Sequence, residues 1–166
     1  MSGIKSNKPN PRGAYRQGYY KLTNAEKYVG DPSKIIYRSS WEYRFCRYCD
    51  HTPEVLKWSS EPVAIPYFSP LDEPGRIKPR NYYVDFYMRV KKGNETIDYL
   101  AEVKPSKSLQ KPILEGVKHT TQKLKNYNYA LQTWIVNRAK FSAAKQYAEK
   151  IGYKFILVTD EFLFGK

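Results

Sequence analysis

Residues 81–90 (NYYVDFYMRV) and 97–104 (IDYLAEVK) decide the fold that we predict for this chain. In both stretches apolar and polar side chains alternate, and β-branched and aromatic types dominate, which is typical of strands with one buried face. Gly93 and Asn94 lie between the two stretches and favour a two-residue hairpin turn. We therefore predict a β-hairpin whose register is set by this turn.

The predicted register gives the hairpin one core face and one charged face. On the core face Val84 lies opposite Val103, among other apolar and aromatic side chains. On the charged face Asp85 lies opposite Glu102, and Lys104 follows two residues along the same strand. Like charges in opposed positions destabilise a sheet, so we expect Glu102→Ala to raise the melting temperature of the metal-free protein. Two converging carboxylates beside an ammonium group predict a site for a hard, oxygen-ligated cation.

The composition indicates one domain and a polyanionic partner. The chain has 166 residues, of which 41% are hydrophobic, and this is enough for one sizeable core. Its net charge of +13 favours nucleic acid over a small acidic ligand. An anionic membrane surface is the competing partner, but Tyr is far more abundant than the residues that insert into bilayers. Without a membrane-spanning apolar run or a signal-peptide core, we expect a soluble protein made in the cytoplasm.

We divide the chain into a basic N-terminal arm, residues 1–27, and a single domain, residues 28–166. Cations and tyrosines interleave in the arm, a mixture that suits contact with phosphates and bases, although a merely solvated terminus is the alternative. A loop predicted over residues 68–80 carries a second basic group suited to a DNA backbone. The candidate DNA-binding residues are Lys5, Lys8, Arg12, Arg16 and Lys21 in the arm, with Arg76, Lys78 and Arg80 in the loop.

The rest of the chain is predicted as alternating strands and helices. Proline positions place one strand at an edge, since Pro62 and Pro66 flank or interrupt it. This order predicts an α/β fold in which helices flank a mixed β-sheet. The predicted strands are 35–37, 55–58, 63–67, 131–136 and 155–158, and the predicted helices are 41–49, 112–127 and 141–151.

Two features of the first helix allow more than one interpretation. Cys46 and Cys49 form a C-x-x-C pair followed by His51, but a structural zinc site normally has a second ligand cluster, so we interpret the cysteines as packing residues. Glu42 lies in the first turn, where it either complements the helix dipole or points toward the same site as Asp85.

An Asp on one strand and Glu-x-Lys on the next resemble the PD-(D/E)xK nuclease superfamily. In this resemblance Asp85 matches the Asp, Glu102 and Lys104 match the E-x-K, and Glu42 matches an acid on the first helix. Val84 stands where the family usually has Pro.

This resemblance implies a restriction-endonuclease-like core and a metal-dependent DNA endonuclease. Asp85, Glu102 and Glu42 are then the ligands of Mg²⁺, for which Mn²⁺ substitutes, and Lys104 positions the attacking water. Glu61 is a further candidate site residue, and the alternative is that it is a solvated acid in a turn. Gln122 is a candidate for contact with a phosphate.

The opening SGIKSNKP and the block YRSSWE are similar to the head completion nucleases of T-even-like phages. This second resemblance implies a protein of the virion head that trims packaged double-stranded DNA and meets portal or neck proteins. Two alternatives stay open. One is a non-cleaving DNA-binding plug or head-assembly protein that retains the fold, and the other is a superfamily enzyme acting on branched or transposon-end DNA.

Overall fold

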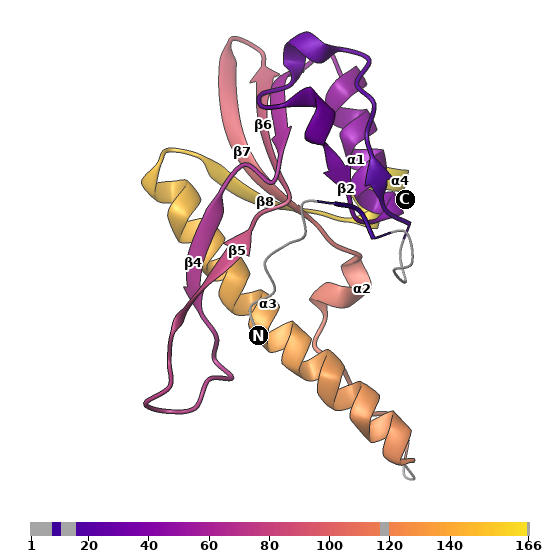
Figure 1. The fold of residues 1–166 in the computed structure, drawn as a ribbon, viewed down its shortest axis with the longest axis vertical. Coiled ribbons are helices and arrows are strands. Elements are labelled where there is room, and N and C mark those ends of the chain that lie inside the picture. Colours follow the sequence, from indigo (N-terminus) through magenta and orange to yellow (C-terminus); the bar gives the residue numbers. More distant parts are fainter. Residues whose placement is uncertain (1–7, 11–15, 117–119, 166) are drawn as a thin grey trace.

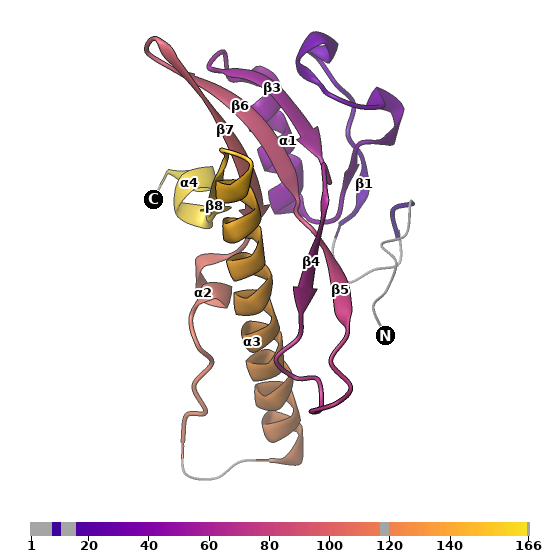
Figure 2. The ribbon, with the colours of Figure 1, turned by 90° about the vertical axis from the view of Figure 1, so that its left-hand side faces the viewer.

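The computed structural model describes residues 8–10, 16–116 and 120–165. The largest sheet of the described residues is a mixed four-stranded sheet in the order β3-β6-β7-β8 (Figures 1 and 2). Helix α1 packs against one face of this sheet and α3 against the other (Figure 2). The predicted α/β fold with a mixed sheet flanked by helices is thus confirmed. The strands are β3 (Val55–Ser60), β6 (Phe86–Lys92), β7 (Glu95–Val103) and β8 (Lys154–Val158), of which only β8 runs parallel to its neighbour, and the two helices are α1 (Ser40–His51) and α3 (Thr121–Lys150).

The hairpin of β6 and β7 has the predicted register. Lys92 pairs with Glu95, and Phe86 pairs with Ala101 at the other end of the ladder. Gly93 has φ 60°, a left-handed conformation that glycine adopts without steric cost. The prediction of a Gly-Asn turn is therefore confirmed.

The strand predicted over residues 81–90 is wrong in one respect, because it is interrupted at Val84 and Asp85. Its first part is β5 (Pro79–Tyr83), which pairs with β4 (Ala64–Phe68) in a separate two-stranded sheet. Val84 consequently packs with Leu100 and Ala144 on the α3 side of the main sheet and does not share the face of Val103. We call β4, β5 and their connecting loop, residues 64–83, the wing. In Figures 1 and 2 the wing extends beyond the main sheet alongside α3.

The C-terminal half of the chain also differs from the prediction. A single helix, α3, occupies the places of a predicted helix end, a predicted strand over 131–136 and a further predicted helix. Tertiary packing overrides the β-propensity of the middle stretch, since Val136 packs as a helical residue into the same cluster as Ala144. Gly152 follows the helix with φ 78°, as expected for a C-terminal glycine. Residues 112–116 are not helical, and two short helices, α2 (Ser106–Leu109) and α4 (Asp160–Phe164), complete this half.

Part of the segment expected to form an arm is packed onto the domain. Strand β1 (Gly18–Tyr19) pairs with β2 (Ile36–Tyr37). The buried Tyr20 hydroxyl donates a hydrogen bond of 2.9 Å to Asp50 of α1, which also accepts from the backbone N–H groups of Thr23 and Asn24. These bonds attach residues 20–24 to the domain. Short 3₁₀ helices, Ala25–Lys27 and Pro32–Lys34, follow.

Helix α1 confirms the packing interpretation of the two cysteines. Cys46 and Cys49 are fully buried beside Phe45, and both thiols are free. No helix in the described part of the chain is long and apolar enough to cross a membrane.

Candidate active site

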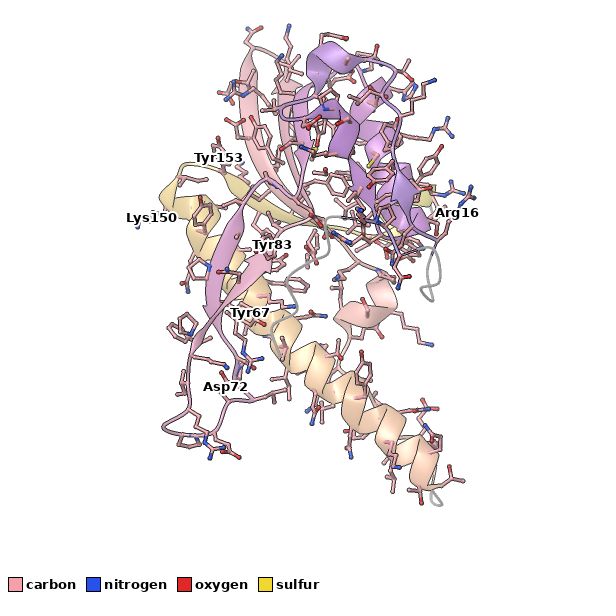
Figure 3. All side chains as sticks on the ribbon, viewed as in Figure 1. Arg16, Tyr67, Asp72, Tyr83, Lys150 and Tyr153 are labelled. Carbon is pink, nitrogen blue, oxygen red and sulfur yellow. The ribbon has the colours of Figure 1, made fainter. Side chains whose placement is uncertain are left out.

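A cleft of about 300 Å³ lies where the main sheet, α1, the wing and α3 meet. It brings together the four predicted catalytic residues, which come from three separate parts of the chain. Tyr83, labelled in Figure 3, marks its position at the junction of the wing and the main sheet. The cleft is lined by Arg38, Glu42, Asn81, Tyr82, Tyr83, Asp85, Glu102, Lys104, Asn137 and Lys140.

Asp85 and Glu102 meet at the edge of the β6–β7 hairpin. The Asp85 carboxylate accepts a hydrogen bond of 3.0 Å from the backbone N–H of Val103, the residue directly after Glu102. Glu102 itself is only 4% exposed. The interruption of the predicted strand does not separate the two acids, because Asp85 directly precedes the first paired residue of β6.

Glu102 has two partners within the cleft. Its Oε2 accepts a hydrogen bond of 2.6 Å from the buried Tyr82 hydroxyl, and its Oε1 lies 2.9 Å from the Lys104 ammonium. Burial and the neighbouring Glu102 raise the pKa of Tyr82 well above its usual range, so its hydroxyl remains a donor. Tyr82 was missed in the sequence because an uninterrupted strand would point Tyr83, its neighbour, toward the charged face.

Lys104 is held in its charged form by the surrounding carboxylates. Burial alone would lower the pKa of this lysine, but Glu102, Asp85 and Glu42 outweigh that effect and raise it above the ordinary value. Because the pKa is raised in the folded state, the stabilisation is present at neutral pH and is lost only in strongly alkaline solution. Lys104 is therefore a cationic donor in the cleft at neutral pH.

Glu42 caps α1 and also lines the cleft. Its carboxylate accepts a hydrogen bond of 2.7 Å from the backbone N–H of Arg38, and its own N–H donates to the Ser39 hydroxyl at 3.1 Å. This reciprocal arrangement is a variant of the capping box. Both interpretations of Glu42 left open by the sequence are thus compatible with its position.

The donor set of the cleft fits a magnesium ion held by two protein carboxylates. Within the described ranges, no group of three or more His, Cys, Asp or Glu side chains is close enough to hold a metal. Mg²⁺ commonly uses only one or two carboxylates and completes its coordination with water and substrate phosphate. Asp85 and Glu102 would meet that requirement, and Glu42, the third predicted ligand, lines the same cleft with its carboxylate bonded to the Arg38 N–H.

Glu61 borders the cleft without lining it. It has φ 46°, a rare conformation outside glycine, and its N–H donates a hydrogen bond of 2.7 Å to the carbonyl of Asp85. Its carboxylate lies 3.0 Å from the guanidinium of Arg38, which does line the cleft. Glu61 thus touches the backbone of one site residue and the side chain of another.

Helix α3 contributes Asn137 and Lys140 to the cleft, and neither residue was predicted. They were missed because we predicted a strand over residues 131–136, where the structure has a continuous helix. A sequence signal was present, because residues 121–150 contain neither Gly nor Pro, which favours one continuous helix. Gln122, the predicted phosphate contact, lies near the start of α3 and outside the cleft, where its side chain donates to Asn126.

The predicted DNA-binding cations that the structure describes do not form one patch. Arg76 lies 3.1 Å from Glu73, and Arg80 forms an ion pair with Asp72, so both pair with acids of the wing loop. Figure 3 shows Arg16 beside α1, far from Asp72 in the wing. Lys8, Lys21 and Lys78 are exposed, and Lys5 and Arg12 lie outside the described residues. A DNA-binding role for these residues stays a prediction.

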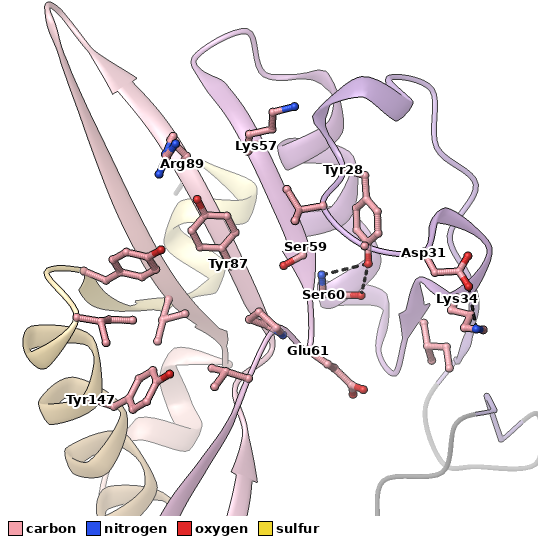
Figure 4. Close-up of a pocket in the computed structure, with 18 residues that line it drawn as sticks. Tyr28, Asp31, Lys34, Lys57, Ser59, Ser60, Glu61, Tyr87, Arg89 and Tyr147 are labelled. Carbon is pink, nitrogen blue, oxygen red and sulfur yellow. Dashed lines mark hydrogen bonds and ion pairs between the residues drawn. The ribbon is translucent and has the colours of Figure 1, made fainter.

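A larger cavity of about 830 Å³ lies beside the C-terminal end of α3, on the sheet face that this helix covers. Tyrosines at positions 28, 87, 147 and 153 line it, and Figure 4 shows the labelled Tyr28, Tyr87 and Tyr147 around its opening. Its charged residues are engaged locally, as in the 2.8 Å ion pair of Lys34 with Asp31. This cavity contains none of the predicted catalytic residues.

The comparisons with known proteins agree with this architecture. Residues 52–160 match the family model described as TnsA-like endonuclease N terminal, and the chain belongs to this family of nucleases with a restriction-endonuclease-like fold. The chain is also similar to the head completion nuclease of Enterobacteria phage T4, with 39% identity over 146 residues, 88% of this chain and 92% of that protein. The predicted nuclease resemblance and fold class are therefore confirmed.

Proposed function

We propose that this nuclease is a metal-dependent endonuclease that hydrolyses phosphodiester bonds of double-stranded DNA in the cleft. The observation that supports this most is the meeting of Asp85, Glu102 and Lys104 in one largely buried, charged site. DNA as the substrate is supported by the nuclease family and by the net charge of +13.

Asp85 and Glu102 are the residues that would hold Mg²⁺ or Mn²⁺. When bound, such a cation makes water more acidic and stabilises negative charge on a phosphate. Tyr82 holds the Glu102 carboxylate in place through its buried hydrogen bond. We assign Glu42 to orienting water at the edge of the site, since its carboxylate already caps α1.

Lys104 provides the positive charge that faces the reacting phosphate. A fixed ammonium donor stabilises charge that develops on phosphate oxygens in the transition state. It need not act as a neutral base. Burial lowers the pKa of Lys104, but the surrounding carboxylates have the larger effect and raise it above the ordinary value of lysine.

Cleavage of linear duplex DNA tests this function. We expect products with Mg²⁺ or Mn²⁺ and none in EDTA, and we expect Lys104→Met to slow cleavage roughly 10²- to 10³-fold. Lys145→Met is the matched control, since Lys145 is exposed on α3 outside the cleft. Cleavage in EDTA, or equal rates for the two variants, would contradict the proposal. Salt-sensitive binding without any product would indicate the non-cleaving plug.

We further propose that the substrate is packaged phage DNA, trimmed near the portal during head completion. The similarity to a head completion nuclease supports this role. DNA-filled heads made without the protein should fail to accept tails, and added wild-type protein should restore joining. Restoration by the cleavage-deficient Lys104→Met variant would show that joining requires the protein but not its nuclease activity.

A further inference from the structure

One face of α3 changes character along the helix. In the C-terminal part of the helix, Ala144 and Ala148 are fully buried in the core cluster that includes the wing. Toward the N-terminus the same face continues at intervals of three or four residues, which keeps side chains in line on a helix. There it carries polar side chains, which we call the polar stripe: Gln122, Asn126, Tyr129, Thr133, Asn137 and Lys140.

The polar stripe runs out of the candidate active site. Asn137 and Lys140 line the cleft, and Thr133 and Asn137 also line two hollows beside it. Leu71 of the wing lines one hollow, and residues of the 107–115 segment line the other. The stripe therefore faces the opening between the wing and that segment.

The outer part of the stripe is exposed, and it includes a tyrosine. Tyr129 is 74% exposed, and Gln122, Asn126 and Thr133 are exposed as well. Figures 1 and 2 show this part of α3 projecting beyond the main sheet. Among the described residues of α3, the fully buried ones thus lie in its C-terminal part.

The chemistry of the projecting helix suits DNA. Residues 121–148 contain no acidic side chain, and they include several lysines. The Gln122 amide donates a hydrogen bond of 2.8 Å to the Asn126 side chain, which holds the two amides side by side. Amides and hydroxyls contact phosphates, sugars and base edges in protein–DNA interfaces.

We propose that the polar stripe binds the DNA duplex on one side of the scissile phosphate. The inference rests on the proposed cleavage in the cleft, because the stripe is continuous with that site. At 1.5 Å per residue, the helix extends about 24 Å from Asn137 to its start, the length of about seven base pairs. The lack of acidic side chains on residues 121–148 and this continuity favour DNA over a protein partner.

Two matched double variants test the inference. Asn126→Ala with Thr133→Ala removes two stripe side chains, and Asn128→Ala with Thr121→Ala removes the same residue types from another face of the exposed helix part. Fluorescence anisotropy with a 30-base-pair duplex in EDTA measures binding without cleavage. We expect the stripe variant to bind roughly tenfold more weakly and the control variant to bind within about twofold of wild type. Circular dichroism should show equal helix content in both.

A second pair of variants adds a carboxylate in place of an amide. Asn126→Asp should weaken duplex binding more than Asn128→Asp, because a negative charge on the stripe repels the DNA backbone at short range. Equal binding by the stripe and control variants in both pairs, with helix content unchanged, would overturn the inference and leave this face to a protein partner. Duplex binding by the wild type without cleavage would instead contradict the proposed function alone, since the comparison of variants needs no cleavage.

Discussion

The cleft at the end of β7 and the tyrosine-lined cavity beside the end of α3 are neighbours with different chemistry. The ion pair of Arg38 with Glu61 joins them, because Arg38 lines the cleft and Glu61 lines the cavity. The cavity has more than twice the volume, yet apart from Glu61 its ion pairs join residues close in the sequence, as Lys34 with Asp31 and Arg89 with Asp98. In the smaller cleft, charges from distant parts of the chain converge. Convergent charge therefore identifies the candidate site better than volume does.

The largest expected effect separates the two regions by activity. Asp85→Asn removes one negative charge from the cleft but keeps an oxygen that accepts from the Val103 N–H. We expect single-turnover cleavage to fall roughly 10³-fold or more, because the cation loses a carboxylate ligand. Thermal unfolding should be close to that of wild type, and cleavage within tenfold of wild type would exclude Asp85 as a ligand.

Glu102→Ala should now lower the melting temperature of the metal-free protein, which reverses the expectation from the sequence. The repulsion between the two acids is offset by partners that the sequence did not show, since Tyr82 and Lys104 both contact Glu102. Removing the carboxylate takes the acceptor from the buried Tyr82 hydroxyl and the ion-pair partner at 2.9 Å from Lys104, at about 2–3 kcal/mol or roughly 5–10 °C. Differential scanning calorimetry measures this, and an increase would show that carboxylate repulsion dominates.

Tyr82→Phe tests the same contact with a smaller change to the protein. The variant loses only the hydroxyl that donates to Glu102, so the carboxylate is less well oriented. We expect cleavage to slow about tenfold and stability to fall by about 1–2 kcal/mol. Tyr87→Phe is the matched control, because its hydroxyl also donates to a carboxylate, that of Asp98, outside the cleft. Equal kinetics for the two variants would mean that the Tyr82 hydroxyl does not position Glu102.

The smallest expected effect concerns the larger cavity. Val29→Trp places an indole at its lining, where Val29 is 50% exposed and only its backbone N–H bonds to β3. We expect cleavage and duplex affinity within about twofold of wild type. A large loss of activity at an unchanged melting temperature would give the cavity a role in the reaction and end the contrast between the two regions.

Local patterns explain which parts of the site could be predicted. The alternation in β6 and β7 and the Gly93-Asn94 turn act over a few residues, so they define which side chains face each other before any tertiary contact. Asp85, Glu102 and Lys104 were found in this way. The first turn of α1 was equally readable, because Ser39 and Glu42 have the spacing of a helix cap.

Contacts between distant segments explain what could not be predicted. The bond from the Glu61 N–H to the Asp85 carbonyl joins the end of β3 to the start of β6, where β5 diverges into the wing. Because of this interruption, the hydroxyl that contacts Glu102 belongs to Tyr82, whereas a continuous strand would have placed Tyr83 on the charged face. Likewise, packing of α3 against the wing and sheet converts a strand-like stretch into a helix and brings Asn137 to the cleft.

The most direct test of the account is the anomalous diffraction of Mn²⁺ in crystals of the protein with duplex DNA. We predict an anomalous peak in the cleft, in contact with the carboxylates of Asp85 and Glu102 and with a DNA phosphate. A peak bound elsewhere, with no manganese at these two carboxylates in crystals whose protein cleaves DNA with Mn²⁺ in solution, would contradict the assignment of the cleft as the active site.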